Sequence, residues 1–120
     1  MNLEDFRNFC LSLPCAKENS PWTEPQYQNL VTFTVADKWF CLLDMDKKAC
    51  NLKCPVESVT ELQDKYQGVL PAWHMNKTHW ITVLLDSDVS AEEIKILVKQ
   101  AYALIVASLS KSKREELGLS

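Results

Sequence analysis

The side chains best suited to chemistry gather in one short segment, His74-Met75-Asn76-Lys77-Thr78-His79-Trp80, which holds both histidines of the chain. Lys77 and His79 are residue types that contact phosphates, Asn76 can hydrogen-bond the edge of a base, and Trp80 can stack on a base. The same side chains can instead satisfy backbone groups of an irregular loop, with Trp80 capping a sheet. Residue types therefore indicate a nucleic-acid contact, while their spacing leaves both interpretations open.

Metal binding is a weaker interpretation of the same region. His74 and His79 are five positions apart, a separation that does not place both imidazoles on one face of a helix, and no carboxylate cluster adjoins them. Cys50 and Cys54 have a C-x3-C spacing, but no second Cys or His pair follows at a companion spacing. The sequence thus predicts neither a metal centre nor another cofactor.

Catalytic templates are missing from the sequence. Its two glycines, Gly68 and Gly118, are too few for a phosphate-binding loop or a dinucleotide fingerprint. Neither G-x-S-x-G nor H-E-x-x-H occurs, and no cysteine shows the local pattern of a nucleophile. We therefore expect a binding protein and not an enzyme.

Composition predicts one domain, residues 1–120, because 47% of the 120 residues are hydrophobic and can form a single core. The formal net charge of −3 argues against a strong, delocalised attraction to nucleic acid or to an anionic membrane. Residues 47–82 are the exception, with five lysines and three acidic residues, a net +2. A nucleic-acid contact is therefore expected in the middle of the chain.

Targeting features point to the cytoplasm. The first twelve residues carry acidic charge and lack the apolar stretch of a secretory signal. The five cysteines are an odd number without the dense spacing of a disulfide scaffold, as expected for reduced thiols. The apolar run at 101–109 is well short of the ~20 residues of a membrane span. We expect a cytoplasmic monomer that does not enter a membrane.

The elements in the first half of the chain are a helix and three strands. Leu3, Phe6, Cys10 and Leu13 form one stripe of a helix that Pro14 ends. A loop is expected over residues 15–28. Strict alternation at 30–35, an apolar run at 39–43 and a third segment at 48–53 then predict three strands of an antiparallel meander.

The second half is predicted to contain a short helix, a strand and a long helix. Pro55 suits the start of the short helix, and Gly68 ends it. Residues 69–78 are expected to be irregular, followed by a strand at 80–85. Ser90 and Glu93 form a capping box for the long helix, and Ser112 with Glu115 suggests another one near the end.

The resulting order, α-β-β-β-α-β-α, is typical of an α+β fold in which the helices lie mainly on one face of an antiparallel sheet. The opposite face is then at least partly open. Alternation places on it a polar set together with one tryptophan: Thr32, Thr34, Asn51, Lys53, Trp80 and Thr82. An exposed Trp80 among basic groups would form a binding face. Alternatively, the loop at 71–73 covers Trp80, and Lys47, Lys48 and Lys53 are ordinary solvated charges.

Residues 71–85, Pro-Ala-Trp-His-Met-Asn-Lys-Thr-His-Trp-Ile-Thr-Val-Leu-Leu, resemble the MmcQ/YjbR family, whose members read P-x-x-H-x-N-K-x-H-W before a strand. Further matches are Phe33-Thr34-Val35 leading to Phe40, Leu52-Lys53-Cys54-Pro55, and Ala101-Tyr102. Where members tend to have Gly-Lys after the first strand, this chain has Asp37-Lys38. The matches are spread over nearly the whole chain.

The resemblance implies a CyaY-like α/β sandwich and a "double-wing" DNA-binding protein. The residues that we expect at its nucleic-acid site are Lys53, His74, Asn76, Lys77, His79 and Trp80. A protein-interaction or regulatory domain using the same sheet face is the alternative. Frataxin-like iron binding through Glu4, Asp5, Asp44 and Asp46 is a distant third.

Overall fold

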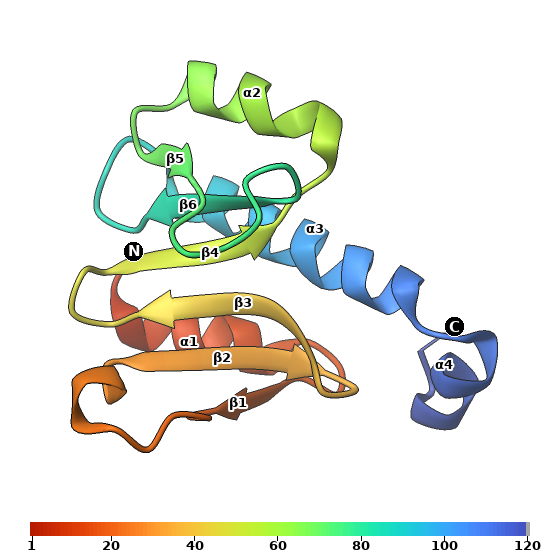
Figure 1. The fold of residues 1–120 in the computed structure, drawn as a ribbon. Helices are drawn as coiled ribbons and strands as arrows, with labels where there is room; N and C mark the ends of the chain where they lie inside the picture. Colours follow the sequence, from red (N-terminus) through yellow and green to blue (C-terminus); the bar gives the residue numbers. More distant parts are fainter. Residues whose placement is uncertain (120) are drawn as a thin grey trace.

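A computed structural model describes residues 1–119 of the chain. Its helices are α1 (Leu3–Ser12), the 3-10 helix η1 (Pro25–Tyr27), α2 (Val56–Lys65), α3 (Ala91–Ser108) and α4 (Lys111–Leu117). Its strands are β1 (Lys17–Asn19), β2 (Leu30–Val35), β3 (Lys38–Asp44), β4 (Ala49–Lys53), β5 (Val69–Pro71) and β6 (Trp80–Leu84). Figure 1 shows these elements in place.

The six strands form one sheet in the order β1-β2-β3-β4-β6-β5, and all neighbours are antiparallel. The α+β class and the antiparallel meander of β2, β3 and β4 are thereby confirmed. Helices α1 and α3 lie behind the sheet, α2 lies beside β5, and α4 lies beyond the end of α3 (Figure 1). The sheet therefore has one helix-covered face.

The core fills the space between the sheet and helices α1 and α3. Its fully buried aromatic residues are Phe6, Phe33 and Phe40, and the rings of Phe6 and Phe40 both lie within 6.5 Å of the Phe33 ring, centroid to centroid. A register shift after Phe33 pairs Thr34 with Trp39, so Phe40 is the extra residue of a β-bulge. The bulge lets consecutive residues Phe40 and Cys41 both lie in the core.

Hydroxyl and amide side chains cap three of the helices. Ser90 Oγ accepts a hydrogen bond from the amide of Glu93 at 3.1 Å, which confirms the predicted start of α3. The predicted cap of the last helix is wrong by two residues, because Ser110 and not Ser112 accepts from the amide of Lys113. Ser110 is the first hydroxyl after α3 ends, and so it reaches the free amides first.

Two short edge strands lie where the sequence predicts loops. β1 pairs with β2 inside the expected loop 15–28, and β5 pairs with β6 inside the segment 69–78. Each is three residues long, too short to show a period of two. β1 is also tied to α1, because the Arg7 guanidinium donates two hydrogen bonds to the Glu18 carboxylate, at 2.9 and 2.7 Å.

The Asp88 carboxylate holds the turn before β5 and makes a pH-dependent contribution to stability. It accepts hydrogen bonds from the amides of Gln67 and Gly68 at 2.8 and 2.7 Å, and these bonds lower the pKa of Asp88. A lowered folded-state pKa means that the contribution is complete above the unfolded pKa of about 3.9 and is lost as the pH falls through the folded value.

We therefore expect Asp88→Asn to lower the thermal unfolding midpoint at about pH 7 and to have a shrinking effect below about pH 4. Thermal unfolding of both proteins over this range measures the difference directly. A difference between the two midpoints that stays constant down to about pH 2 would mean that the charge of Asp88 plays no part.

Candidate binding face

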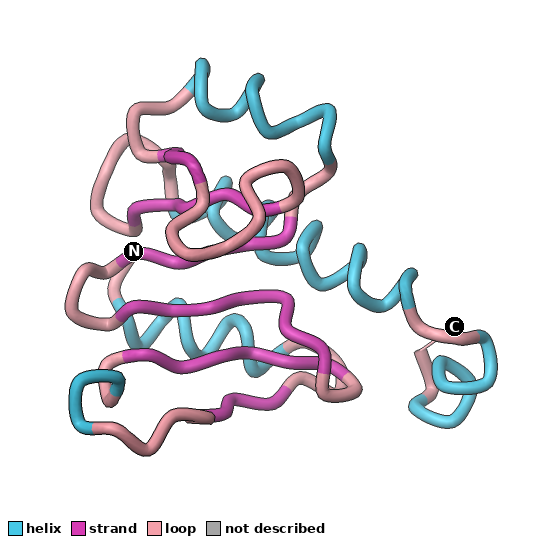
Figure 2. Tube along the Cα trace, viewed as in Figure 1, coloured by secondary structure: helices cyan, strands magenta, loops and turns pink. Residues whose placement is uncertain are grey.

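The sheet face opposite α1 and α3 is lined by the predicted polar set. Thr32 is paired with Leu42, Leu42 with Asn51, and Asn51 with Thr82, so these side chains share one face across four strands. The face is less open than a bare sheet surface, however, because Thr32, Asn51 and Thr82 are each at most 6% exposed. The loop between β5 and β6 passes in front of β4 and β6 and covers their centre (Figures 1 and 2).

Two buried side chains fasten this loop to the sheet through the backbone of Trp73. The Trp73 amide donates to Thr82 Oγ1 at 2.9 Å, and the Trp73 carbonyl accepts from Asn51 Nδ2 at 2.6 Å. Thr82 Oγ1 in turn donates to Asn51 Oδ1 at 2.5 Å. Asn51 and Thr82 therefore form a latch that fixes the position of Trp73.

Other polar groups of the segment 74–80 also stabilise the loop. Asn76 Oδ1 accepts from the amides of Thr78 and His79 at 2.8 and 3.1 Å. Lys77 Nζ donates to the Ala72 carbonyl at 2.8 Å, and the His79 carbonyl accepts from the Cys54 amide at 2.8 Å. The structural interpretation of these residues, which the sequence left open, accounts for most of their hydrogen bonds.

Trp80 is buried, with 8% of its surface exposed. It pairs with Lys53 across β4 and β6, and the Lys53 ammonium lies 5.5 Å from the centroid of its ring. The expectation that Trp80 stacks on a base is therefore wrong, because its ring is already covered by protein.

The remaining three tryptophans of the chain lie around one hollow on this face. This aromatic hollow has a volume of about 390 Å³ and is lined by Trp22, Tyr27, Leu30, Trp39, Leu42, Trp73, His74 and Met75. The Trp22 ring contacts Trp39 edge to face at 5.6 Å and lies 6.3 Å from Tyr27. Residues from three distant parts of the chain thus form one apolar, ring-lined surface.

A second hollow lies on the other side of Trp73 and His74. This basic hollow has a volume of about 490 Å³ and is lined by Lys47, Leu70, Pro71, Ala72, Trp73, His74, Lys77, Thr82 and Leu84. The Lys47 ammonium lies 4.6 Å from the centroid of the Trp73 ring. Trp73 and His74 line both the aromatic hollow and the basic hollow, and we call these two shared residues the Trp73–His74 ridge.

The backbone of His74 is strained at the top of this ridge. Its φ is 54°, a left-handed conformation that costs a non-glycine residue free energy. The imidazole packs against the Trp73 indole with 4.2 Å between ring centroids. The latch on the preceding residue supports this conformation, and both residues line the two hollows.

The six residues predicted at the site separate into three groups. His74 and Lys77 line the basic hollow, Lys53 and Trp80 contact each other on the strands, and Asn76 and His79 lie outside both hollows. The sequence prediction missed the residues that form the rest of the face: Lys47, Trp22, Tyr27, Trp39 and Trp73. The available signal was that Trp22 and Trp73 lie in segments predicted to be loops, outside the core stripes.

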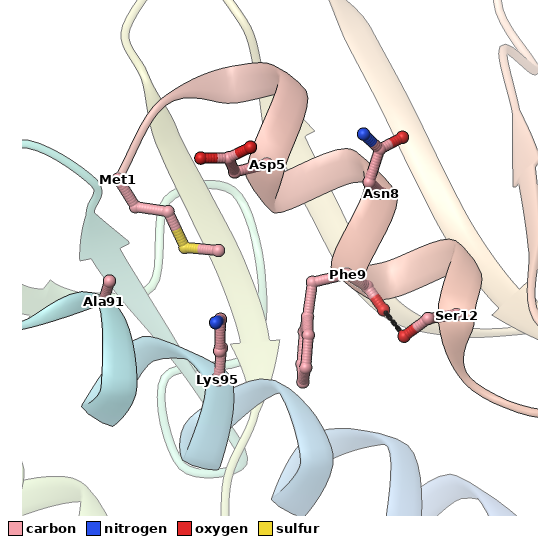
Figure 3. Close-up of a pocket in the computed structure, with 7 residues that line it drawn as sticks. All are labelled: Met1, Asp5, Asn8, Phe9, Ser12, Ala91 and Lys95. Carbon is pink, nitrogen blue, oxygen red and sulfur yellow. Dashed lines mark hydrogen bonds between the residues drawn. The ribbon is translucent and has the colours of Figure 1, made fainter.

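A hollow on the helix side of the molecule is less suited to a ligand. It lies between α1 and the start of α3, with Asp5, Phe9 and Lys95 among its lining residues (Figure 3). It carries one charge of each sign. The Ser12 hydroxyl already donates to the Phe9 carbonyl at 2.6 Å, and Lys95 pairs with Glu92 at 3.7 Å.

Cys41, Cys54 and Asp44 are buried inside the fold. Burial raises the pKa of Cys41 well above its ordinary value and the pKa of Cys54 to about 11, so both thiols stay protonated and unreactive. Asp44 is buried and accepts from Asn29 Nδ2 and the Lys47 amide.

Within residues 1–119, no three His, Cys, Asp or Glu side chains lie close enough together to hold a metal ion. No helix of this part of the chain is both long and apolar enough to cross a bilayer.

A six-stranded antiparallel sheet with two helices behind it and a latched loop in front defines a small α+β class of protein. A family model described as YjbR matches residues 11–104. The chain therefore belongs to the YjbR family, as its resemblance over residues 71–85 implied.

Relatives and solved structures agree with this assignment. The chain is 28% identical to the uncharacterised protein YjbR of Escherichia coli (strain K12), over 98% of both chains. It is 33% identical to the uncharacterised protein YyaQ of Bacillus subtilis (strain 168), over 70% of this chain and 80% of that one. The crystal structure of Deinococcus radiodurans protein DR2400, with family domain DUF419, has a TM-score of 0.88 at 31% identity and covers 99% of this chain and 89% of its own.

Proposed function

We propose that this protein is a non-enzymatic binding module for single-stranded nucleic acid, with the aromatic hollow as the site for its bases. The observation that carries the proposal is the gathering of three of the four tryptophans, with Tyr27, around one hollow on the face away from α1 and α3. These rings do not belong to the core cluster. Stacking on a base uses such rings without requiring a particular base sequence.

Basic side chains lie next to the rings, where the backbone of a stacked strand would pass. Lys47 and Lys77 line the neighbouring basic hollow, and Lys53 lies at the end of β4. This is the part of the sequence with a net positive charge, residues 47–82. A strand with unpaired bases can therefore place its bases and its phosphates on different sides of the ridge.

Single-stranded nucleic acid suits this face better than a duplex. Duplex binding relies on a broad basic surface, whereas this chain carries a net charge of −3. A duplex also keeps its base faces stacked inside the helix, where Trp22, Trp39 and Trp73 could not reach them. The proposal therefore replaces the "double-wing" mode of DNA binding with stacking in a hollow.

Trp39→Ala is the variant that tests base stacking. Because one stacked base contributes about 1–3 kcal/mol, we expect the dissociation constant for a short oligothymidylate to rise roughly 5- to 150-fold. Quenching of tryptophan fluorescence at low salt measures binding, and repeating the titration with a duplex of similar length tests strand preference.

Phe9→Ala is the matched control, because Phe9 is an aromatic residue that lines the helix-side hollow instead. It should leave the dissociation constant unchanged, provided that thermal unfolding shows both variants to be folded. Failure of the wild-type protein to bind the oligonucleotide at low salt, or equal binding by Trp39→Ala, would remove nucleic acid from the proposal.

A protein partner is the second candidate, and exposed apolar residues on both sides of the ridge favour it. Tyr27, in the aromatic hollow, is 42% exposed, and Leu70, in the basic hollow, is 38% exposed. Tryptophan and tyrosine side chains are enriched at protein interfaces. A protein that co-purifies with the wild type but not with Tyr27→Ala, together with no binding of oligonucleotides, would select this alternative.

The proposal also includes a cytoplasmic monomer that acts without a cofactor. The state of the cysteines supports the compartment, because Cys10, Cys15, Cys41, Cys50 and Cys54 are all unpaired thiols.

A further inference from the structure

We propose that the basic hollow is a phosphate subsite, in which Lys47 and Lys77 bind a phosphate of the ligand whose base occupies the aromatic hollow. The inference rests on the proposed function and extends it from base stacking to recognition of the phosphate group. Four observations carry it: the sign of the lining charges, the absence of carboxylate partners for them, the apolar walls and the shared ridge.

All the charged side chains that line the basic hollow are cationic. These are Lys47 and Lys77, and no Asp or Glu lines the hollow. Other hollows of the molecule differ in this respect: one contains Asp5 beside Lys95, and another contains Arg7 between Glu4 and Glu18. The basic hollow therefore attracts an anion where the others do not.

The two lysines are positioned but not neutralised. Lys77 uses one of its three N–H donors on the Ala72 carbonyl at 2.8 Å, which fixes the ammonium and leaves two donors. Lys47 lies over the Trp73 ring at 4.6 Å from its centroid. None of the ion pairs in the described part of the chain involves Lys47 or Lys77, whereas the adjacent Lys48 pairs with Asp86 at 3.5 Å.

Apolar side chains complete the walls of the basic hollow. Leu70, Pro71 and Leu84 line it together with the Trp73 ring. Low-polarity walls strengthen the attraction between an ammonium group and an anion, because less water competes for either charge. Lysine is a suitable phosphate ligand at such a position because it acts as a point charge and needs no fixed approach angle.

The shared ridge connects this subsite to the stacking site. Trp73 and His74 line both hollows, so a ligand that lies across the ridge reaches both of them. A nucleotide has this bipartite chemistry, with a flat base and an anionic phosphate joined by a sugar. The geometry therefore points to a nucleotide unit as the smallest ligand that fills both hollows.

The test uses two probes on the full chain, an oligothymidylate and inorganic pyrophosphate. We expect pyrophosphate to shift the backbone amide NMR signals of Trp73 and His74. Lys47→Met, which keeps the aliphatic contact with Trp73, should raise the dissociation constant of each probe about tenfold. It should also reduce the slope of log affinity against log salt by about 0.7 for the oligonucleotide.

Three further variants separate charge from structure. Lys77→Arg keeps the cation and should bind both probes like the wild type, while Lys77→Met should lose affinity. Lys48→Met removes a neighbouring lysine that pairs with Asp86 and should change nothing. Loss of affinity in Lys77→Arg as well as in Lys77→Met would assign Lys77 to loop structure alone and contradict the inference.

The outcomes distinguish this inference from the proposed function. Oligonucleotide binding with an unchanged salt slope in Lys47→Met would overturn the phosphate subsite and leave base stacking standing. Binding of pyrophosphate that depends on Lys47, without binding of the oligonucleotide, would support the anion site and overturn the nucleic-acid proposal. No effect of pyrophosphate on Trp73 or His74 would overturn the subsite.

Discussion

Asn51→Ala is expected to lower the free energy of unfolding by about 2–6 kcal/mol, because it leaves two buried polar groups without partners at about 1–3 kcal/mol each. The carbonyl of Trp73 loses its donor, and the Thr82 hydroxyl loses its acceptor. Asn51 is 3% exposed, so water cannot easily replace the missing side chain. Urea-induced unfolding measures the change.

The matched control for Asn51→Ala is Asn19→Ala at the edge of the same sheet. Asn19 also hydrogen-bonds a threonine, donating to Thr34 Oγ1 at 3.1 Å, but it is exposed. Its replacement should cost less than about 1 kcal/mol. Equal effects of the two substitutions would show that the latch does not hold the loop. Because Asn51→Ala releases Trp73 from its position, the affinity of this variant for oligothymidylate should also fall.

Phe33→Ala is expected to lower the free energy of unfolding by about 3–5 kcal/mol, the usual cost of removing a buried ring. Phe33 is fully buried on β2, and its ring contacts Phe6 of α1 edge to face at 6.4 Å and Phe40 of β3 at 6.5 Å. The cavity would open where α1 meets two strands. These elements cannot collapse into the space without breaking the sheet register.

An exposed aromatic residue provides the comparison for Phe33. Tyr27 is 42% exposed in the wall of the aromatic hollow, and Tyr27→Ala should cost less than about 1 kcal/mol. Chemical denaturation of both variants tests the division of the aromatic residues between core and binding face. A loss of stability for Tyr27→Ala as large as that for Phe33→Ala would place Tyr27 in the core and contradict this division.

The sequence predicted those elements whose pattern is long enough to repeat. β2 alternates over six residues, and α3 carries an apolar stripe over 18 residues after its capping box. Both were found close to the predicted positions. The cause is physical, because each element must turn one apolar face to the same core, and burial selects the period of that face.

The edge strands β1 and β5 could not be predicted in this way. Three residues contain too few side chains to show alternation, and both strands form because a neighbouring strand offers free backbone groups. Lys17–Asn19 pairs with β2, and its Glu18 also accepts two hydrogen bonds from Arg7 of α1. Such long-range contacts leave no local pattern in the sequence.

The structure shows contacts of the predicted site residues that the sequence did not predict. Of the segment 74–80, His74, Met75 and Lys77 line the two hollows, whereas Asn76 hydrogen-bonds within the loop and Trp80 is buried. The sequence does not show that the loop folds back across β4 and β6, because the latch joins residues 22 and 9 positions apart. Because the loop folds back in this way, the ring that is free to stack on a base belongs to Trp73 and not to Trp80.

The four tryptophan side chains provide the most direct test of the proposed binding face. In a two-dimensional NMR spectrum of the nitrogen-15-labelled protein, each indole N–H gives its own signal, and an oligothymidylate can be added stepwise. The account predicts that the signals of Trp22, Trp39 and Trp73 shift together, while the signal of the buried Trp80 stays in place. Shifts confined to Trp80, or to amides of α1 and α3, would contradict it.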